Sequence, residues 1–285
     1  MDWSRAKTIL ITAFAIVNMV LGVNLLVKTY GGFKTTIIPQ EEINQAVSIL
    51  ESYGISVECD IPGKVPAMPF LTVGHQVIDP QKAAQKFFNT ENLKQEKTED
   101  GVSFFYGKEQ LIVMNNGIIS YFNNEQEEKR YRNLTPQKAK EIAEEFMQNH
   151  GGIPDDAKFD RIFYYDQSNS FLVEYVQQYK NYFLASGYID VLVTESGVKS
   201  YYSSWLKVKG YSGPSKKLIS PIHALLKMVD VLEHQEGVLT ITGIDLGYYS
   251  RYYNAESWQA VPVWRITTRQ KECYYINGYT GELEQ

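Results

Sequence analysis

The side chains that most often carry out chemistry are few in this chain and widely spaced. The two cysteines, Cys59 and Cys273, are 214 residues apart and form no CxxC pair. No two histidines stand at i and i+4, the spacing that places two imidazoles on one face of a helix to bind zinc. The four histidines are His75, His150, His223 and His234. The sequence therefore predicts no metal site and no cofactor, and it leaves the pairing of the cysteines open.

Carboxylates are the other candidates for chemistry, as general acids and bases. Adjacent pairs occur at Glu127-Glu128, Glu144-Glu145 and Asp155-Asp156, all in polar contexts where solvation explains them. The run Asp166-x-Ser168-x-Ser170 is similar to a calcium loop but has Phe171 where glycine is required. The sequence also lacks a GxSxG elbow, an HExxH pair and a phosphate-binding glycine loop. We therefore predict a protein that is not an enzyme, with an unrecognised hydrolase as the weakest alternative.

Adjacent tyrosines are the most unusual feature of the composition. In a strand, neighbouring side chains point to opposite faces, so each pair offers one ring to the core and one to solvent. Half-buried sheet packing explains this pattern, and a recognition surface is the functional alternative. The pairs are Tyr164-Tyr165, Tyr201-Tyr202, Tyr248-Tyr249, Tyr252-Tyr253 and Tyr274-Tyr275.

The composition is that of a folded protein. Of its 285 residues, 44% are hydrophobic and 13% aromatic, so the low-hydrophobicity signature of disorder is absent. The net charge is −5, which gives no basis for counterion-driven binding to nucleic acid. We therefore expect no nucleic-acid partner.

An uncharged segment near the N-terminus predicts a membrane span. Residues 9–27 contain no charged side chain and would extend about 28 Å as a helix, close to the thickness of a bilayer core. Arg5 and Lys7 precede it, so the positive-inside rule places residues 1–8 in the cytoplasm and residues 28–285 outside. We expect a retained single-pass signal anchor in the cell membrane. A buried soluble helix and a cleaved signal peptide are the alternatives.

One face of this predicted helix carries small and amide side chains. They recur at spacings of three and four residues, and small residues allow close helix approach in lipid while an amide seeks a hydrogen-bond partner. This pattern predicts a docking face for a partner helix; a plain lipid anchor is the alternative. The face consists of Ile11, Ala15, Asn18, Gly22 and Leu25.

Beyond the membrane segment, the chain repeats one pattern of helix followed by strands. Three helix starts combine a capping side chain, proline at the first helical position and alanine three residues later. They are Asp79-Pro80 with Ala83, Thr135-Pro136 with Ala139, and Ser220-Pro221 with Ala224. A turn glycine closes each unit: Gly117, Gly197 and Gly281. The sequence therefore predicts an α+β fold of repeated helix-plus-antiparallel-sheet units, with full second and third copies and a shortened first.

Two polar stretches suggest how the units are divided. Asn123 to Leu134 is almost wholly polar and predicts a linker, which separates a first extracytoplasmic domain, 28–131, from a second, 132–285. The second domain would hold two repeat units, 135–206 and 218–285. Between these units, Lys207 to Lys217 predicts a surface loop whose lysines are solvated, with contact to an anionic polymer as the alternative. Before the first unit, Pro39 to Gly54 predicts a short helix.

Two sets of motifs resemble known families. The opening MDWSRAKTI at residues 1–9, leading into the apolar segment with Asn18 near its middle, resembles the start of the YycI family, and so do the proline-rich Pro62 to Phe70 and the repeated units after it. Less specifically, PVWRI at residues 262–266, followed by Tyr274 to Asn277 and Thr280 to Leu283, is similar to the closing strands of PepSY-type domains.

The YycI resemblance implies a function in signalling. Proteins of that family are accessory regulators of the WalK/WalR (YycG/YycF) two-component system, which controls cell-wall metabolism in low-GC Gram-positive bacteria. The resemblance implies that this chain acts with a YycH-like membrane protein on the sensor histidine kinase WalK/YycG, and it leaves the sign of regulation open. It supplies no catalytic motif. A PepSY-type envelope-binding or protease-inhibiting module is the alternative.

Overall fold

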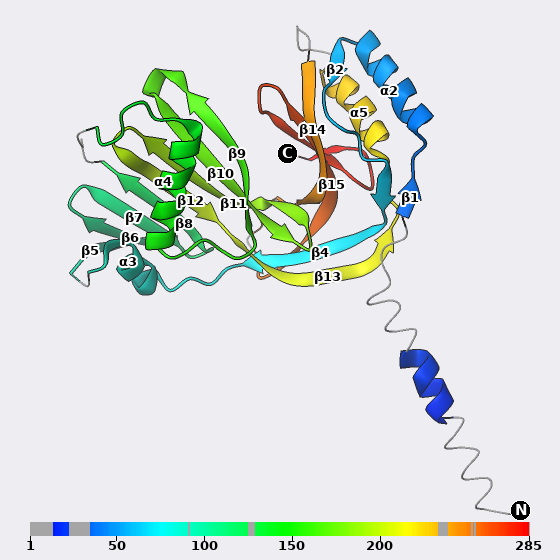
Figure 1. Ribbon diagram of the computed structural model, residues 1–285. Coiled ribbons are helices and arrows are strands. Elements are labelled where there is room, and N and C mark those ends of the chain that lie inside the picture. Colours follow the sequence, from blue (N-terminus) through cyan, green and yellow to red (C-terminus); the bar gives the residue numbers. More distant parts are fainter. Residues whose placement is uncertain are drawn as a thin grey trace, which may run out of the picture.

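The computed structural model describes residues 14–22, 35–90, 92–124, 129–232, 239–251, 253 and 255–284. Residues 14–22 form a helical segment that stands apart from two sheet-rich lobes (Figure 1). Its apolar side chains are exposed: Phe14 is 70% and Met19 73% accessible. Within the described residues, we find no helix whose length and apolar character would suffice to cross a membrane. The rest of the predicted span, 9–27, lies outside those residues.

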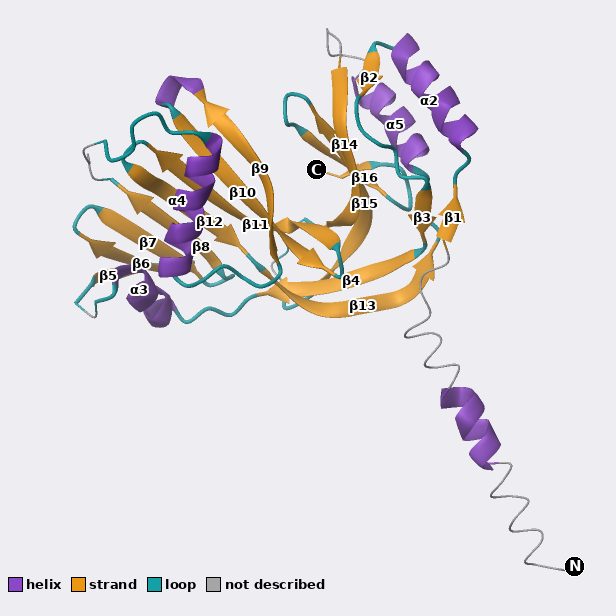
Figure 2. Ribbon diagram, in the orientation of Figure 1, coloured by secondary structure: helices purple, strands orange, loops and turns teal. Residues whose placement is uncertain are grey.

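Three segments fold in the same order, as a helix followed by four antiparallel strands that pair in sequence (Figure 2). The first unit contains α3 (Pro80–Phe88), β5 (Lys94–Lys97), β6 (Gly101–Tyr106), β7 (Glu109–Met114) and β8 (Ile118–Asn123). The second contains α4 (Pro136–Asn149), β9 (Ala157–Tyr165), the 3-10 turn η1 (Asp166–Ser168), β10 (Ser170–Tyr179), β11 (Tyr182–Thr194) and β12 (Gly197–Ser204). The third contains α5 (Pro221–Leu232), β14 (Leu239–Tyr249), β15 (Trp258–Thr268), β16 (Cys273–Asn277) and β17 (Leu283–Glu284).

The three predicted helix starts are confirmed. Asp79 accepts hydrogen bonds from the backbone N–H groups of Gln81 and Lys82, at 2.9 and 3.2 Å. Thr135 and Ser220 each accept one from the residue three positions on, at 3.2 and 3.1 Å. Each cap satisfies an otherwise orphaned donor and contributes about 1 kcal/mol to helix stability. The alanines at the fourth helical position are buried against the sheets in all three units.

The closing glycines also occupy equivalent places. Gly117 and Gly281 precede the fourth strand of their units, and Gly197 begins it; their φ angles are 82°, 77° and 120°. These positive angles strain any residue with a Cβ, which is why glycine recurs there. The first unit is shortened because its strands have 4 to 6 residues, against 8 to 13 in the second.

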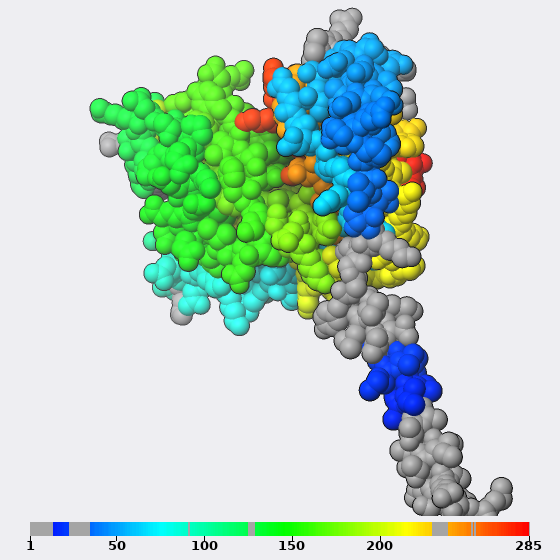
Figure 3. All heavy atoms as spheres, turned by 45° about the vertical axis from the view of Figure 1, so that its right-hand side comes forward, coloured from blue at the N-terminus to red at the C-terminus, as the bar shows by residue number. Residues whose placement is uncertain are grey.

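The remaining elements join the third unit to form the second lobe. These elements are β1 (Thr35–Ile37), α2 (Gln40–Ser52), β2 (Ile55–Val57), β3 (Lys64–Pro66), β4 (Met68–His75) and β13 (Leu206–Lys216). The long strands β4 and β13 pair with each other, and β4 also pairs with β15. Figure 3 shows α2, in blue, on the outside of this lobe. The helix predicted between Pro39 and Gly54 is confirmed as α2.

The stretch from Lys207 to Lys217, predicted as a surface loop, is instead mostly strand β13. Its antiparallel pairing with β4 shifts register between Val208 and Gly210 and again between Ser212 and Lys216. Glycine and proline suggested a loop, but such residues are tolerated where a ladder is irregular, and Pro214 lies inside the second shift. Local composition therefore failed here because the partner strand is far away in the sequence.

The packing crosses the boundary predicted between residues 131 and 132. In the second lobe, Leu50 and Met68 share one core with Trp264 and other residues of the third unit. In the first lobe, β8 of the first unit pairs antiparallel with β12 of the second. Tyr201 packs against the cores of both units in that lobe. The predicted division into domains 28–131 and 132–285 therefore stays a prediction. The two lobes divide the chain at different positions.

Candidate functional site

The predicted docking face lies partly within the described helical segment. Ala15, Asn18 and Gly22 are at spacings that place them on one face of the segment 14–22. Ala15 and Asn18 are exposed, and a Cβ added at Gly22 would meet no atom within 4 Å. The other two residues of the face, Ile11 and Leu25, lie outside the described residues. For the described part, close approach of a second helix is sterically open.

A second group of functional side chains, which the sequence analysis missed, lies where the second and third units meet. Four residues form a row across neighbouring strands of the second unit, because Arg161 is opposite Glu174, Glu174 opposite Asp190, and Asp190 opposite Tyr202. Directly paired residues share a face of the sheet. This row therefore places one cation and two carboxylates side by side, with the like-charged Glu174 and Asp190 directly opposed.

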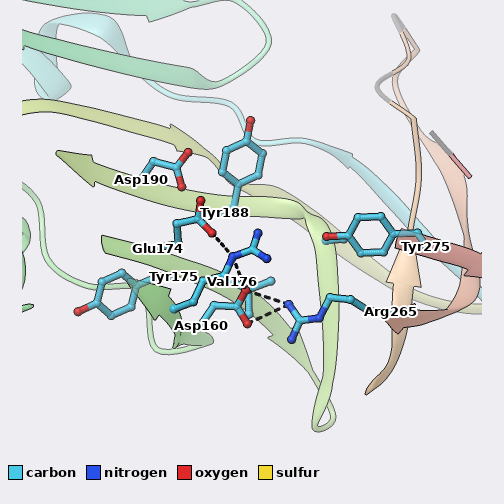
Figure 4. Close-up of a pocket in the computed structure, with 10 residues that line it drawn as sticks. Asp160, Glu174, Tyr175, Val176, Tyr188, Asp190, Arg265 and Tyr275 are labelled. Atoms are coloured by element: carbon cyan, nitrogen blue, oxygen red, sulfur yellow. Dashed lines mark hydrogen bonds and ion pairs between the residues drawn. The ribbon is translucent and has the colours of Figure 1, made fainter. Parts of the chain in front are cut away.

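A bulge brings one more carboxylate into the group. Arg161 pairs with Glu174 while Phe159 pairs with Tyr175, so Asp160 is an extra residue on β9 with no partner in the ladder. Adjacent residues of a regular strand point to opposite faces, but a bulge re-aims a side chain. Asp160 can thus reach the interface with the third unit (Figure 4), as Arg161 does through its hydrogen bond to Cys273.

Arg265 on β15 crosses from the third unit to this carboxylate. Its Nη1 donates to both Asp160 oxygens at 2.9 Å (Figure 4), and its Nη2 donates to Asp245 at 3.2 Å. The guanidinium carbon lies 4.5 Å from the ring centre of Phe183. The Arg265 and Asp160 side chains are only 12% and 14% exposed, beside a cavity of about 180 Å³. We call Asp160, Arg161, Glu174, Asp190 and Arg265 the interlobe ionic cluster.

Arg161 forms the second bridge between the lobes. It makes an ion pair with Glu174, and its Nη1 donates to the sulfur of Cys273 on β16 at 2.6 Å. Both cysteines are free. Cys59 is half-buried elsewhere, where burial and the charges of Asp245 and Asp60 raise the pKa of its thiol to about 11. The two cysteines are therefore thiols in different surroundings, and only Cys273 touches the cluster.

The cluster contains a carboxyl group that titrates near neutrality. Burial, and then the charge of Glu174, raise the pKa of Asp190 to about 7, although the Arg161 charge opposes the shift. Burial also raises the pKa of the neighbouring Tyr275 to about 12. Among the described residues, no group of histidine, cysteine, aspartate or glutamate side chains is arranged to hold a metal ion. The chemistry available to the cluster is therefore gain or loss of a proton at Asp190.

This shift predicts how Asp190→Asn changes stability with pH. The folded pKa exceeds the unfolded value of about 3.9, so the folded state binds more protons between those values and loses stability as pH rises through about 7. An asparagine side chain cannot ionise, so the advantage of the variant over the wild type should grow from near zero at pH 4 to about 4 kcal/mol at pH 8. Urea denaturation across this range measures the difference. Asp155→Asn, at an exposed turn position, should show no such trend, and parallel curves for the Asp190 variant and the wild type would refute the assignment.

The fold and its sites define a class before any comparison is made: an α+β protein of three successive helix-plus-meander units whose lobes meet at buried ion pairs. The chain belongs to the YycI family, because the family model described as "YycI protein" matches residues 34–279. The opening motif at residues 1–9 lies outside that match. A search of curated proteins finds no match.

The fold also occurs among solved structures. One of them is the crystal structure of an uncharacterized protein from Eubacterium rectale ATCC 33656 at 1.45 Å resolution. The TM-score is 0.54 at 10% sequence identity, and the alignment covers 81% of this chain and 91% of the other. At this identity the likeness shows a common fold and carries no information on function.

Proposed function

We propose that this protein is a non-enzymatic accessory regulator of the sensor histidine kinase WalK/YycG and acts together with a YycH-like membrane protein. The match of the YycI family over residues 34–279 is the observation that carries this proposal. A regulator of this kind shifts a kinase between two states, and it can do so only by binding one state more tightly than the other.

The proposal includes a location. Residues 9–27 span the cell membrane once, residues 1–8 face the cytoplasm, and residues 28–285 lie outside. The uncharged sequence of the segment and the cationic residues before it support this topology. The exposed apolar side chains of residues 14–22 also support it, because such a surface is stable only when lipid or another protein covers it.

Contacts would then form at two levels. In the bilayer, Ile11, Ala15, Asn18, Gly22 and Leu25 dock against a partner helix. Outside, the two lobes contact the extracytoplasmic parts of the kinase and of the YycH-like protein. The ion pair between Arg265 and Asp160 and the hydrogen bond from Arg161 to Cys273 join the two lobes, so a partner that contacts both would bind them as one body.

A second candidate function rests on exposed aromatic residues. Among the described strands β9 pairs only with β10, and Tyr164 and Tyr165 at its end are 50% and 47% exposed. Exposed tyrosines beside a strand edge suit recognition of an extended partner, as in a PepSY-type envelope-binding or protease-inhibiting module. Purification of the protein from membranes separates the two functions: recovery of the kinase supports regulation, and recovery of peptidoglycan or a protease supports the second.

The double variant Asn18→Leu with Gly22→Leu tests the docking face. Leucine at position 22 blocks close backbone approach, and leucine at position 18 removes an interhelical hydrogen bond worth about 0.6 kcal/mol. We expect co-immunoprecipitation of the kinase and the YycH-like protein from membranes to fall about tenfold. The expression of a reporter gene under the control of the kinase should change as the association with these partners falls.

The matched control is Ile16→Leu, which changes an exposed residue on a different face of the same segment. It should leave both signals at the wild-type level. If the double variant behaves like this control, the docking face is wrong, and regulation would depend on the extracytoplasmic lobes alone.

A further inference from the structure

A large cleft lies between the first lobe and the start of β13, and it shares no lining residue with the cavity at the interlobe ionic cluster. Its walls are the segment before α3, α3 itself, the loop after α4, the end of β10 and the beginning of β13. Its volume is about 1120 Å³, above the range of roughly 300–1,000 Å³ that drug-sized ligands occupy. The size suits a segment of a chain molecule better than a small metabolite.

Lysines from two opposite walls give the cleft a positive charge. Lys82 and Lys86 come from α3, and Lys207 comes from β13. All three are exposed, and none makes an ion pair with another described residue. A fourth, Lys180, lies over the rings of Tyr179 and Tyr211, at 5.4 and 4.8 Å from their centres.

The two carboxylates that line the cleft do not neutralise these lysines. Asp79 accepts the backbone N–H groups at the start of α3, as described above. Asp156 accepts hydrogen bonds from Gln177 Nε2 at 2.9 Å and from Trp205 Nε1 at 3.1 Å. Both acids keep their negative charge, but four lysines line the cleft against these two carboxylates, so a net positive charge remains for a ligand.

Apolar side chains form part of the lining of the cleft, which we call its floor, and two of the aromatic rings there are largely covered. Phe87 and Trp205 are 9% and 8% exposed, so they offer no open ring face for stacking of a sugar or a base. Val77, in an extended segment between β4 and α3, is 93% exposed at the mouth of the cleft. Aliphatic side chains of a ligand can pack against Val77 and the floor. The side-chain amides of Gln76 and Gln178 also line the cleft and can form hydrogen bonds with the backbone of a peptide.

We propose that this cleft binds an extended acidic peptide segment of a protein partner. Carboxylates of the peptide face Lys82, Lys86 and Lys207, and its aliphatic side chains lie against Val77 and the floor. Lysines supply charge without the fork geometry of arginine, which suits flexible carboxylates spaced along a chain. The site does not depend on the docking face in residues 9–27 or on the identity of the kinase.

The test uses the full chain in nanodiscs of zwitterionic lipid and a fluorescein-labelled short peptide in which glutamate and valine alternate. We expect saturable binding by anisotropy at physiological ionic strength. Reversing one lysine on each wall, Lys82→Glu with Lys207→Glu, should raise Kd about tenfold or more. The matched control is Lys64→Glu with Lys158→Glu, which changes the net charge equally at exposed positions outside the cleft and should leave Kd close to the wild-type value.

A localisation experiment accompanies the titration. Bound peptide should slow backbone hydrogen exchange in residues 76–88, 150–152, 177–180 and 205–208, and Val77→Asp should weaken binding without lowering the melting temperature. Equal loss of binding in the cleft and control variants overturns the proposal. So does equal binding of a peptide with lysine in place of glutamate, or cleft-dependent binding of a sulfated polysaccharide in place of the acidic peptide.

Discussion

Replacing Arg265 with methionine should lower the free energy of unfolding by about 3–5 kcal/mol. The change removes both hydrogen bonds from Arg265 to Asp160, whose side chain is only 14% exposed in the wild type. A largely buried carboxylate thus loses its main partner. Asp245, the other acid in contact with Arg265, is 53% exposed and can return to water. Urea denaturation of the full chain, followed by tryptophan fluorescence, measures the loss.

Two further variants separate the buried charge from lost packing. Adding Asp160→Asn to Arg265→Met should regain roughly half of the loss, because the unpaired negative charge is then absent. Arg269→Met breaks the ion pair between Arg269 and Glu58, whose side chains are 61% and 48% exposed, respectively. This change should lower the free energy of unfolding by less than about 1 kcal/mol. Equal costs for Arg265→Met and Arg269→Met would show that the interlobe pair is solvated and contributes little.

The interlobe ionic cluster contains both the ion pair that joins the two lobes and a carboxyl group, Asp190, whose pKa is raised to about 7. Asp160 and Arg161 belong to one lobe and Arg265 to the other, so their contacts set how the lobes meet. Asp190 lies beside Glu174 and Arg161 and changes its charge near pH 7. Ionisation of Asp190 redistributes the attraction of Arg161 between two carboxylates.

Local signals in the sequence predicted the repeating elements well. A capping side chain, proline and alanine act within one helical turn, so Asp79, Thr135 and Ser220 mark helices whatever the rest of the chain does. The closing glycines are equally local, because a positive φ is a property of one residue. The order of helix and strands in each unit follows from these marks.

Contacts between distant segments could not be predicted in the same way. The composition of β13 predicts a loop, because its strand character depends on pairing with β4, more than 130 residues earlier in the chain. The parallel contact of β11 with β14, at Phe183 and Leu184, likewise joins separate units. Nothing in the local composition of either segment encodes its partner.

The ionic cluster did leave a signal that can be recognised in retrospect. Glu174, Asp190 and Arg265 each stand between two buried apolar residues within a strand, as in Val173-Glu174-Tyr175. This alternation normally indicates a solvent-facing charge. Here the third unit packs over that face of the second, so the same pattern yields buried ion pairs. The sequence predicts the face on which each charge lies, and tertiary packing decides whether water reaches it.

Gly187→Ala should destabilise the protein by about 3 kcal/mol, because β11 passes against a fixed side chain at this point. An added Cβ would lie 2.8 Å from Gln177 Cβ and closer still to its amide oxygen. Gln177 is 2% exposed, donates to Asp156 and to the Leu206 carbonyl, and accepts from the Leu206 N–H. It cannot turn away without leaving buried polar groups unpaired.

The matched control is Gly243→Ala in β14, where the new Cβ would lie at an ordinary contact distance, 3.5 Å from Thr267. This variant should stay within about 1 kcal/mol of the wild type in urea denaturation. In a Gln177→Ala background, Gly187→Ala should cost less, because the amide oxygen, which is the nearest atom, is then absent while the Cβ at 2.8 Å remains, and neighbouring sites do not add independently. The hydrogen bonds to Leu206 indicate that Gln177 ties β10 to the start of β13. This interpretation is wrong if Gly187→Ala lowers the free energy of unfolding no more than Gly243→Ala does, because Gln177 is then free to move.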